Sequence, residues 1–148
     1  MQMIKKNGTI VIEVQYLLNT IKDLTFDNIY HEHTNYWSLS TLNKFLKSLG
    51  LIIFKVETIN THGGSIRVYV CQNESVSIDN SVNELLKEEE AYGLKKLTTY
   101  IDFGEKIQNL KKKVLDNLQK LKKKHKNIIG YGAPATATTT LNFFNIRD

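Results

Sequence analysis

The sequence predicts an α/β fold with a small sheet, because three β-branched and aromatic runs are separated by segments with helical periodicity. These runs are residues 9–14, 51–58 and 65–71, and each is rich in the residue types that favour strands. Six residues, 59–64, join the last two runs and include two adjacent glycines. A connection that short is typical of a hairpin. We therefore expect all three runs in one sheet, with residues 65–71 antiparallel to residues 51–58.

Helices are predicted between and after these strands. Residues 15–21 have apolar positions at helical spacing and suggest a short turn or helix. Ser40 is a typical N-cap, and Gly50 lies where a C-terminal glycine is favoured. Between them, apolar residues recur at spacings of three and four: Leu42, Phe45, Leu46 and Leu49.

The second half of the chain reads as mostly helical. Residues 79–81 offer caps for a helix through Glu89, and a long amphipathic helix follows from Ile107. Gly93 and Gly104 each cost stability inside a helix and could interrupt it. Residues 127–134 are expected to form a strand running into a glycine turn, followed by another helix.

Composition narrows the class of protein. The 148 residues are 41% hydrophobic and 24% charged, which is typical of one ordinary globular domain. No run of about 20 apolar residues predicts a membrane span, and the first residues lack the apolar core of a signal peptide. A single cysteine, Cys71, excludes an internal disulfide and a multi-cysteine zinc site. We expect a cytoplasmic protein without a bound metal.

The net charge of +5 is concentrated in residues 111–126, which hold eight lysines. A nucleic-acid surface is one interpretation, but the segment has no arginine, Phe, Tyr or Trp among the lysines. A solvated helix face is the favoured interpretation, and we expect neither a nucleic-acid nor a membrane partner. Such a charge could still attract a phosphate-bearing substrate over a distance.

One stretch, residues 26–37, brings together residues suited to acid–base chemistry: Tyr30, His31, Glu32 and His33. The two histidines are two positions apart, so in an extended chain they share one side while Glu32 points to the other. The spacing differs from the H-E-x-x-H zinc helix. An extended catalytic loop with a base, a carboxylate and a phenol fits the pattern. A surface loop with an incidental histidine pair is the alternative.

Three motifs in order resemble one known family. They are Asp27-x-x-Tyr30-His31-Glu32-His33-x-x-Tyr36, then His62-Gly63-Gly64-Ser65-Ile66-Arg67, then Gly130-Tyr131-Gly132-Ala133-x-Ala135. Together they resemble the S-adenosylmethionine-dependent sugar C-methyltransferases. That resemblance implies transfer of a methyl group from S-adenosylmethionine to carbon 3 of a nucleotide-linked 4-keto-deoxysugar.

The resemblance also implies a domain arrangement. Residues 1–78 would be the second half of a Rossmann-like methyltransferase sheet, in the order strand, helix, strand, hairpin, strand. Residues 79–125 would be a helical connector, and residues 126–148 the start of a C-terminal Rossmann-like domain. The sequence contains no match to the family's glycine-rich cofactor turn, which would precede residue 1. The expectation is therefore a fragment, inactive alone, whose cofactor half comes from elsewhere. A second chain is the candidate partner that would supply it.

The resemblance assigns roles to individual residues. His33 would be the base that removes the sugar C3 proton, while Tyr30 and Glu32 orient or polarise the keto-sugar. His31 is expected to be structural, and Tyr36 and Trp37 to be packing residues.

Further residues are assigned to substrate binding: His62, Gly63, Gly64, Ser65, Arg67, Tyr131 and Gly132. On spacing alone, Arg67 could fork onto a phosphate or form an inter-strand ion pair in a hairpin. The glycines at 130 and 132 suit a phosphate cradle or a simple tight turn. Thr136 stands where the family commonly has a lysine, so this loop brings no positive charge of that kind.

A protein that binds without catalysing is the alternative to an enzyme. A non-catalytic relic could hold a nucleotide-sugar or a partner chain without methylating anything. A neighbouring reading frame that encodes a strand and a glycine-rich turn would favour a split enzyme over this alternative.

Overall fold

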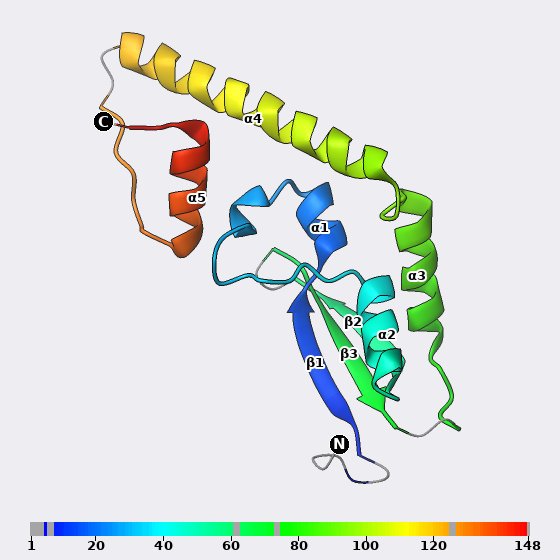
Figure 1. The fold of residues 1–148 in the computed structure, drawn as a ribbon. Helices are drawn as coiled ribbons and strands as arrows, with labels where there is room; N and C mark the ends of the chain where they lie inside the picture. Colours follow the sequence, from blue (N-terminus) through cyan, green and yellow to red (C-terminus); the bar gives the residue numbers. More distant parts are fainter. Residues whose placement is uncertain (1–4, 6–7, 61–62, 73–74, 125–126, 148) are drawn as a thin grey trace.

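The sheet has three strands, and every hydrogen-bonded neighbour is antiparallel. The computed structural model describes residues 5, 8–60, 63–72, 75–124 and 127–147. In it, β1 (Ile10–Gln15), β2 (Ile52–Ile59) and β3 (Ser65–Cys71) lie in the order β1-β3-β2. Figure 1 shows β3 between the other two. The strands predicted at residues 9–14, 51–58 and 65–71, and the antiparallel pairing of β2 with β3, are confirmed. The small antiparallel sheet gives a mixed α/β fold, and a Rossmann-like sheet is not established by it.

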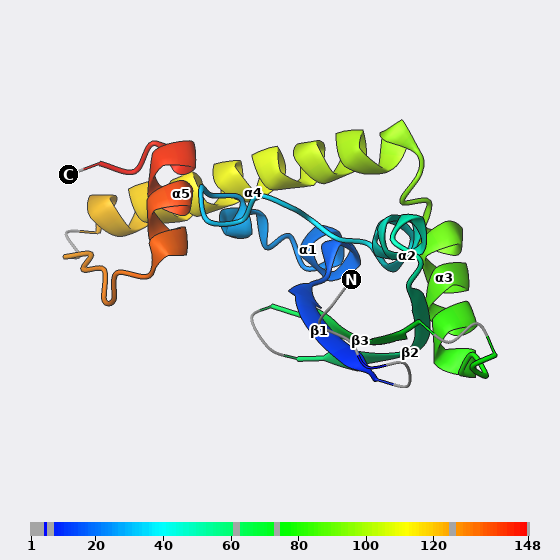
Figure 2. The same cartoon turned by 60° about the horizontal axis from the view of Figure 1, so that its bottom comes forward.

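Helices cover one face of this sheet and enclose the core. They are α1 (Leu17–Lys22), α2 (Leu39–Ser48) and α3 (Asn80–Tyr92), with the short 3-10 turn η1 (Phe26–Asn28) after α1. Figure 2 shows α1 and α2 over the sheet, with α3 along β2. The alternate side chains of β3 that face these helices are fully buried: Ile66, Val68 and Val70. Every second side chain of β3 and every third or fourth side chain of α2 is buried, and together these side chains form one apolar layer.

The N-terminal cap of α2 differs from the expectation. Ser38, and not Ser40, caps the helix: its Oγ accepts from the Thr41 N–H at 3.1 Å, and Thr41 Oγ1 accepts from the Ser38 N–H at 3.1 Å. Ser40 lies inside the helix, where its N–H donates to Glu89 Oε2 at 3.0 Å. The carboxylate of α3 satisfies this helix end, which short-range sequence patterns cannot reveal.

Two of the three glycines expected at helix ends or interruptions do end a helix, and the third does not. Gly50 follows α2 with a φ of +72°, and Gly93 ends α3 with a φ of +85°. Asp79 caps α3 by accepting from the Ser81 N–H at 2.9 Å. Gly104 does not interrupt its helix, because α4 runs unbroken from Leu97–Lys123, ten residues earlier than the expected start at Ile107.

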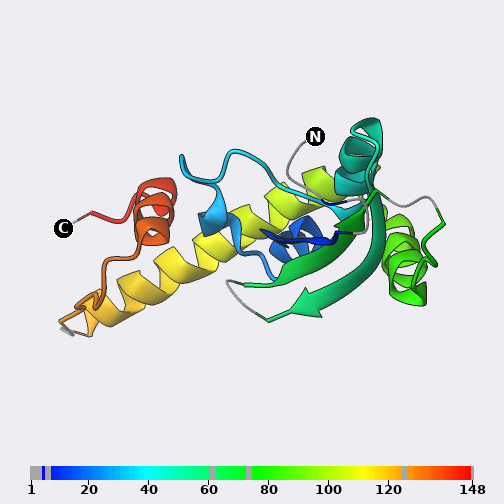
Figure 3. The same ribbon diagram turned by 90° about the horizontal axis from the view of Figure 1, so that it is seen from below.

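The C-terminal segment folds back along α4. Figure 1 shows α4 extending past the sheet and α5 (Ala135–Phe144) returning beside it, and Figure 3 shows the same pair from below. A second apolar cluster joins them, with Phe26 of η1 against Ile107 and Phe144. Lys111, expected on the solvated face, instead donates to the Phe143 carbonyl at 2.7 Å. None of the described helices is both long and apolar enough to cross a membrane.

The expected strand at residues 127–134 is wrong. This segment is an irregular connection between α4 and α5, with Ile129 and Tyr131 almost fully exposed. A strand gains its stability from backbone hydrogen bonds to a neighbour, and no strand lies beside this segment within the described residues. The β-branched run at residues 128–129 therefore has nothing to pair with, and the expected Rossmann-like opening is not seen.

Candidate active site

The loop after η1 is held at both ends. At its start, the buried Phe26 packs against Phe143 and Phe144 of α5, with ring centroids 5.4 Å apart in each case. At its end, the Trp37 carbonyl accepts from the Leu17 N–H at 3.0 Å. The residues between these anchors, 29–36, have no helical or strand structure, as expected for a loop.

His33 is oriented by the backbone of the same loop. Its Nδ1 lies 2.9 Å from the Asn28 carbonyl oxygen. A carbonyl can only accept, so Nδ1 carries the proton in this contact. In the neutral ring the other nitrogen, Nε2, then keeps its lone pair and can act as a base. The imidazole lies beside the Tyr30 ring, at 4.6 Å between centroids.

Tyr30 and Glu32 form a hydrogen-bonded pair, in which the Tyr30 hydroxyl donates to Glu32 Oε2 at 3.2 Å. Partial burial and the charge of Glu32 both raise the pKa of Tyr30. The hydroxyl therefore stays protonated at neutral pH, and its single proton is directed at Glu32 in this arrangement. His31 points outward, with a side chain 87% exposed and its Nε2 only 4.0 Å from Glu32 Oε1.

A cavity of about 400 Å³ opens beside this loop. Four parts of the chain line it, namely the end of β1, the loop, the start of β3 and the start of α5: Glu13, Val14, Gln15, Asn28, Tyr30, His33, Ser65 and Thr136. A smaller cavity of about 260 Å³ also touches His33 and is lined by Glu32. Segments more than 100 positions apart in sequence thus meet around Tyr30 and His33.

The glycines of the second motif bring the β2–β3 connection against α1. Gly64 has a φ of +102°, and its carbonyl accepts from the Tyr16 N–H at 3.0 Å. A Cβ at this position would lie 2.1 Å from Asn19 Nδ2, so only glycine fits. This contact places the buried Ser65 at the cavity wall. His62, the other expected binding residue here, lies outside the described residues.

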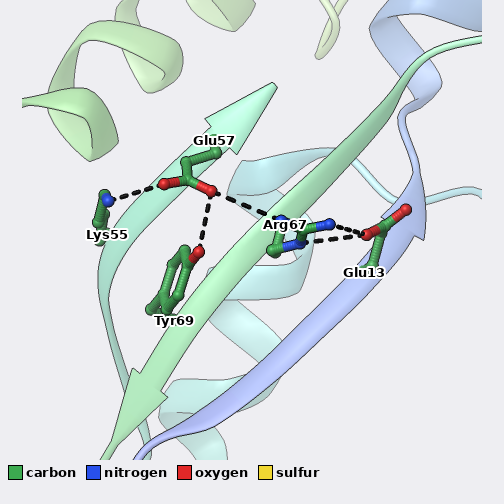
Figure 4. A network of polar contacts seen from close by, with 5 residues as sticks. All are labelled: Glu13, Lys55, Glu57, Arg67 and Tyr69. Carbon is green, nitrogen blue, oxygen red and sulfur yellow. Dashed lines mark hydrogen bonds and ion pairs between the residues drawn. The ribbon is translucent and has the colours of Figure 1, made fainter. Parts of the chain in front are cut away.

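Arg67 lies in an ion-pair network on the face of the sheet opposite the helices (Figure 4). Its Nε and Nη2 donate to Glu13 Oε2 at 3.2 and 2.8 Å, and its Nη1 lies 3.9 Å from Glu57 Oε2. Glu57 also accepts from Tyr69 at 2.9 Å and pairs with Lys55 at 2.7 Å. The inter-strand ion pair, one of the two interpretations of Arg67, is present. Since Glu13 lines the cavity, the network ends at the cavity wall.

The residue that directly follows the third motif lines the cavity. Tyr131 is fully exposed and Gly132 has a φ of +89° in the irregular connection, and neither lines the cavity. Thr136, in the first turn of α5, does line it. The Thr139 hydroxyl donates to the Ile29 carbonyl at 3.5 Å, a contact that ties α5 to the loop.

Comparison with known proteins identifies the family of this chain. The model of the C-methyltransferase C-terminal domain matches residues 60–148, which is more than half of the chain. The chain belongs to this C-methyltransferase family. It is also 31% identical over 140 residues to the C-methyltransferase NovU of Streptomyces niveus. That alignment covers 94% of this chain and 33% of the relative, so the chain spans about a third of the length of the curated relative it matches.

The described part of this C-methyltransferase chain does not fit the methyl donor S-adenosylmethionine. A donor of this kind needs a close backbone approach at a strand end, as a glycine-rich turn provides. The turn from β1 into α1 is Gln15-Tyr16-Leu17, without glycine, and Gly130 stands in an open connection with no atom within 4 Å of an added Cβ. Within the described residues there is also no cluster of three His, Cys, Asp or Glu side chains suited to a metal ion.

Four lining residues were not singled out from sequence: Glu13, Val14, Gln15 and Asn28. Glu13 is a polar position in the strand predicted at residues 9–14, and Gln15 begins the turn or helix predicted at residues 15–21. Neither position indicates a site until the neighbouring elements are known. Asn28 lies inside the first motif, but its contribution is a backbone carbonyl. No side-chain pattern predicts that.

Proposed function

We propose that the chain is the later part of an S-adenosylmethionine-dependent C-methyltransferase acting on the carbon next to the ketone of a nucleotide-linked 4-keto-deoxysugar, with His33 as general base. The observation that supports this best is the orientation of His33. Its Nδ1 is engaged by the Asn28 carbonyl, which leaves Nε2 as the basic nitrogen beside a cavity that Tyr30 also lines. S-adenosylmethionine would supply an electrophilic methyl group.

The residues of the loop match the demands of the carbanion chemistry. Nε2 of His33 takes the proton from C3, and the electron pair of the broken C–H bond moves into the ketone to give an enolate. A positioned base contributes about 10²–10⁴-fold to such a step. The Tyr30 hydroxyl would donate to the developing oxyanion at C4 once its single proton turns from Glu32 to that oxygen. Without substrate, Glu32 Oε2 accepts that proton at 3.2 Å.

Substrate contacts beyond the loop come from the β2–β3 connection and from the third motif. Ser65 lines the cavity beside His33, and we keep His62, Gly63, Gly64 and Arg67 as binding residues by resemblance. Tyr131 and Gly132 would reach a nucleotide that extends out of the cavity past Thr136.

The greater length of the relative supports a catalytic domain and a cofactor site that lie partly outside this chain. We place residues 1–78 in the catalytic domain, 79–125 in a connector and 126–148 at the start of a C-terminal domain. The cofactor would bind to residues that this chain does not contribute. A non-catalytic nucleotide-sugar-binding or protein-interaction module is the second candidate, favoured by the poor fit of the described residues to the methyl donor.

Solvent exchange separates the two candidates. The missing part is restored by fusing this chain to the remaining two thirds of the relative, and a nucleotide-linked 4-keto-sugar is supplied in deuterated water without methyl donor. Deuterium should enter C3. His33→Asn removes the basic nitrogen at similar size and should slow exchange by about 10²–10⁴-fold.

His31→Asn is the matched control, because His31 is exposed and lies outside the cavity lining. Its exchange should remain near the wild-type rate. Exchange abolished by His31→Asn but retained by His33→Asn would assign the base to the other histidine. A binding module would bind the sugar, detected by calorimetry, and give no exchange at all.

A further inference from the structure

Three donors converge on one backbone oxygen in the candidate active site. The Asn28 carbonyl accepts from His33 Nδ1 at 2.9 Å, from the Tyr30 N–H at 3.2 Å and from the Tyr36 hydroxyl at 3.3 Å. Such an oxygen has two lone pairs, which the three donors share. The direction of this carbonyl sets the direction of the His33 ring.

Tyr36 connects this oxygen to the rigid part of the fold. Its neighbour in sequence, Trp37, accepts from the Leu17 N–H at 3.0 Å and forms a parallel bridge with the buried Tyr16. The Tyr36 hydroxyl therefore ties the peptide at the start of the loop to the anchored residue at its end. His33 lies inside the closed segment between residues 28 and 36.

We infer that Tyr36 is a positioning residue for His33. Through the Asn28 carbonyl, its hydroxyl holds His33 in the tautomer with the proton on Nδ1 and the lone pair on Nε2. The sequence pattern pointed to a packing role for this tyrosine, and the structure assigns it a polar one. The consequence for catalysis rests on the proposed function, whereas the tautomer is a property of this chain without substrate.

The effect follows from the cost of losing one hydrogen bond. The peptide between Asn28 and Ile29 stays held by the Ile29 N–H, which donates to the Phe26 carbonyl at 2.9 Å, and by the Tyr30 N–H at 3.2 Å. Without the Tyr36 hydroxyl it loses the contact that ties its carbonyl to the end of the loop, so the direction in which that carbonyl receives Nδ1–H is less closely fixed. The His33 contact then weakens, and the alternative tautomer, protonated on Nε2 and bonded to solvent, gains population. An ordinary hydrogen bond changes an equilibrium by about 2- to 12-fold, and the tautomer ratio should fall within that range.

The test is ¹⁵N NMR of this chain labelled at histidine, above the pH at which imidazoles are charged. The two nitrogens of His33 report directly which one carries the proton, and the signal is assigned by its absence in His33→Asn. Wild type should show the Nδ1-protonated form in majority. In Tyr36→Phe, the ratio of Nδ1-protonated to Nε2-protonated forms should be about 2- to 12-fold lower.

Tyr100→Phe is the matched control. The Tyr100 hydroxyl also donates to a backbone carbonyl, that of Leu94 at 2.7 Å, and neither residue lines the cavity. This variant should leave the His33 tautomer unchanged, while thermal unfolding confirms that both variants fold. Equal ratios in the two variants would overturn the inference, and so would a wild-type His33 protonated mainly on Nε2.

The wild-type measurement keeps the inference testable even where Tyr36→Phe fails to fold. Failure of the proposed function has a different signature. A fused enzyme that exchanges no C3 proton, together with the expected tautomer shift in Tyr36→Phe, would reject the catalytic role of His33 and retain its positioning by Tyr36.

Discussion

The Tyr16 hydroxyl donates to the Glu89 carboxylate at 3.0 Å in the core, although the two residues are 73 positions apart. Tyr16 is 1% exposed and Glu89 is 2% exposed. The same carboxylate accepts from the N–H groups of Leu39 and Ser40 at the start of α2. One buried acidic group thus joins the end of β1 to two helices, and its removal would leave several donors without an acceptor.

Glu89→Gln should therefore destabilise the chain. An amide of the same shape offers one acceptor and places an NH₂ group against backbone donors, so we expect a loss of about 1–3 kcal/mol in the free energy of unfolding. Urea unfolding measures it. Glu90→Gln is the control, because Glu90 is exposed on the same helix turn, and should change stability by no more than about 0.5 kcal/mol. Equal effects of the two variants would contradict the buried role of Glu89.

Two glycine substitutions should have opposite signs. Gly64→Ala forces a Cβ to within 2.1 Å of Asn19 Nδ2 at a φ of +102°, and should cost more than about 1 kcal/mol. Gly104→Ala lies in the exposed middle of α4 with nothing within 4 Å, and should gain about 0.5–1 kcal/mol. Thermal and urea unfolding give both values. A neutral Gly64→Ala would mean that the β2–β3 connection does not pack against α1 in this way.

Stability should fall in acid partly because of Asp79. The hydrogen bonds from the Ser81 side chain and N–H lower the pKa of Asp79 in the folded chain. A carboxyl whose folded pKa is depressed stabilises the fold above its unfolded pKa of about 3.9, and this contribution is lost as pH falls through the folded value. Asp79→Asn keeps an N-cap without a titrating group, so the urea midpoint should depend less steeply on pH below about pH 4. An unchanged slope would show that Asp79 does not contribute.

The chain should not bind S-adenosylmethionine by itself. Within the described residues, no glycine-rich turn joins the end of a strand to a helix, and Gly130 and Gly132 stand in an irregular connection that follows α4. Isothermal titration calorimetry should detect no binding at millimolar ligand, whereas the fused enzyme should bind. A micromolar dissociation constant for the chain alone would place a cofactor site among residues that we assign to other roles.

The candidate site shows where residue patterns were sufficient. Tyr30, His33 and Ser65 were selected from motifs, and all three line one cavity. Their assigned roles stay predictions until exchange is measured. Asn28 could not be selected in the same way, because a backbone carbonyl leaves no trace in side-chain chemistry. Arg67 was left between two interpretations, and the register that places it opposite Glu13 and Glu57 shows the ion pair.

By itself, the sequence determined the three strands, the helix α3 that Asp79 caps and the loop character of residues 29–36. Those features depend on short-range periodicity, capping and glycine conformation, which are written into neighbouring residues. Only the tertiary structure decided that the Glu89 carboxylate accepts from the Ser40 N–H. It also decided that residues 127–134 have no strand partner among the described residues, and that α5 brings Thr136 to the cavity. Each of these depends on a hydrogen-bond or packing partner distant in the chain, and the free energy of such a contact belongs to the pair rather than to either residue.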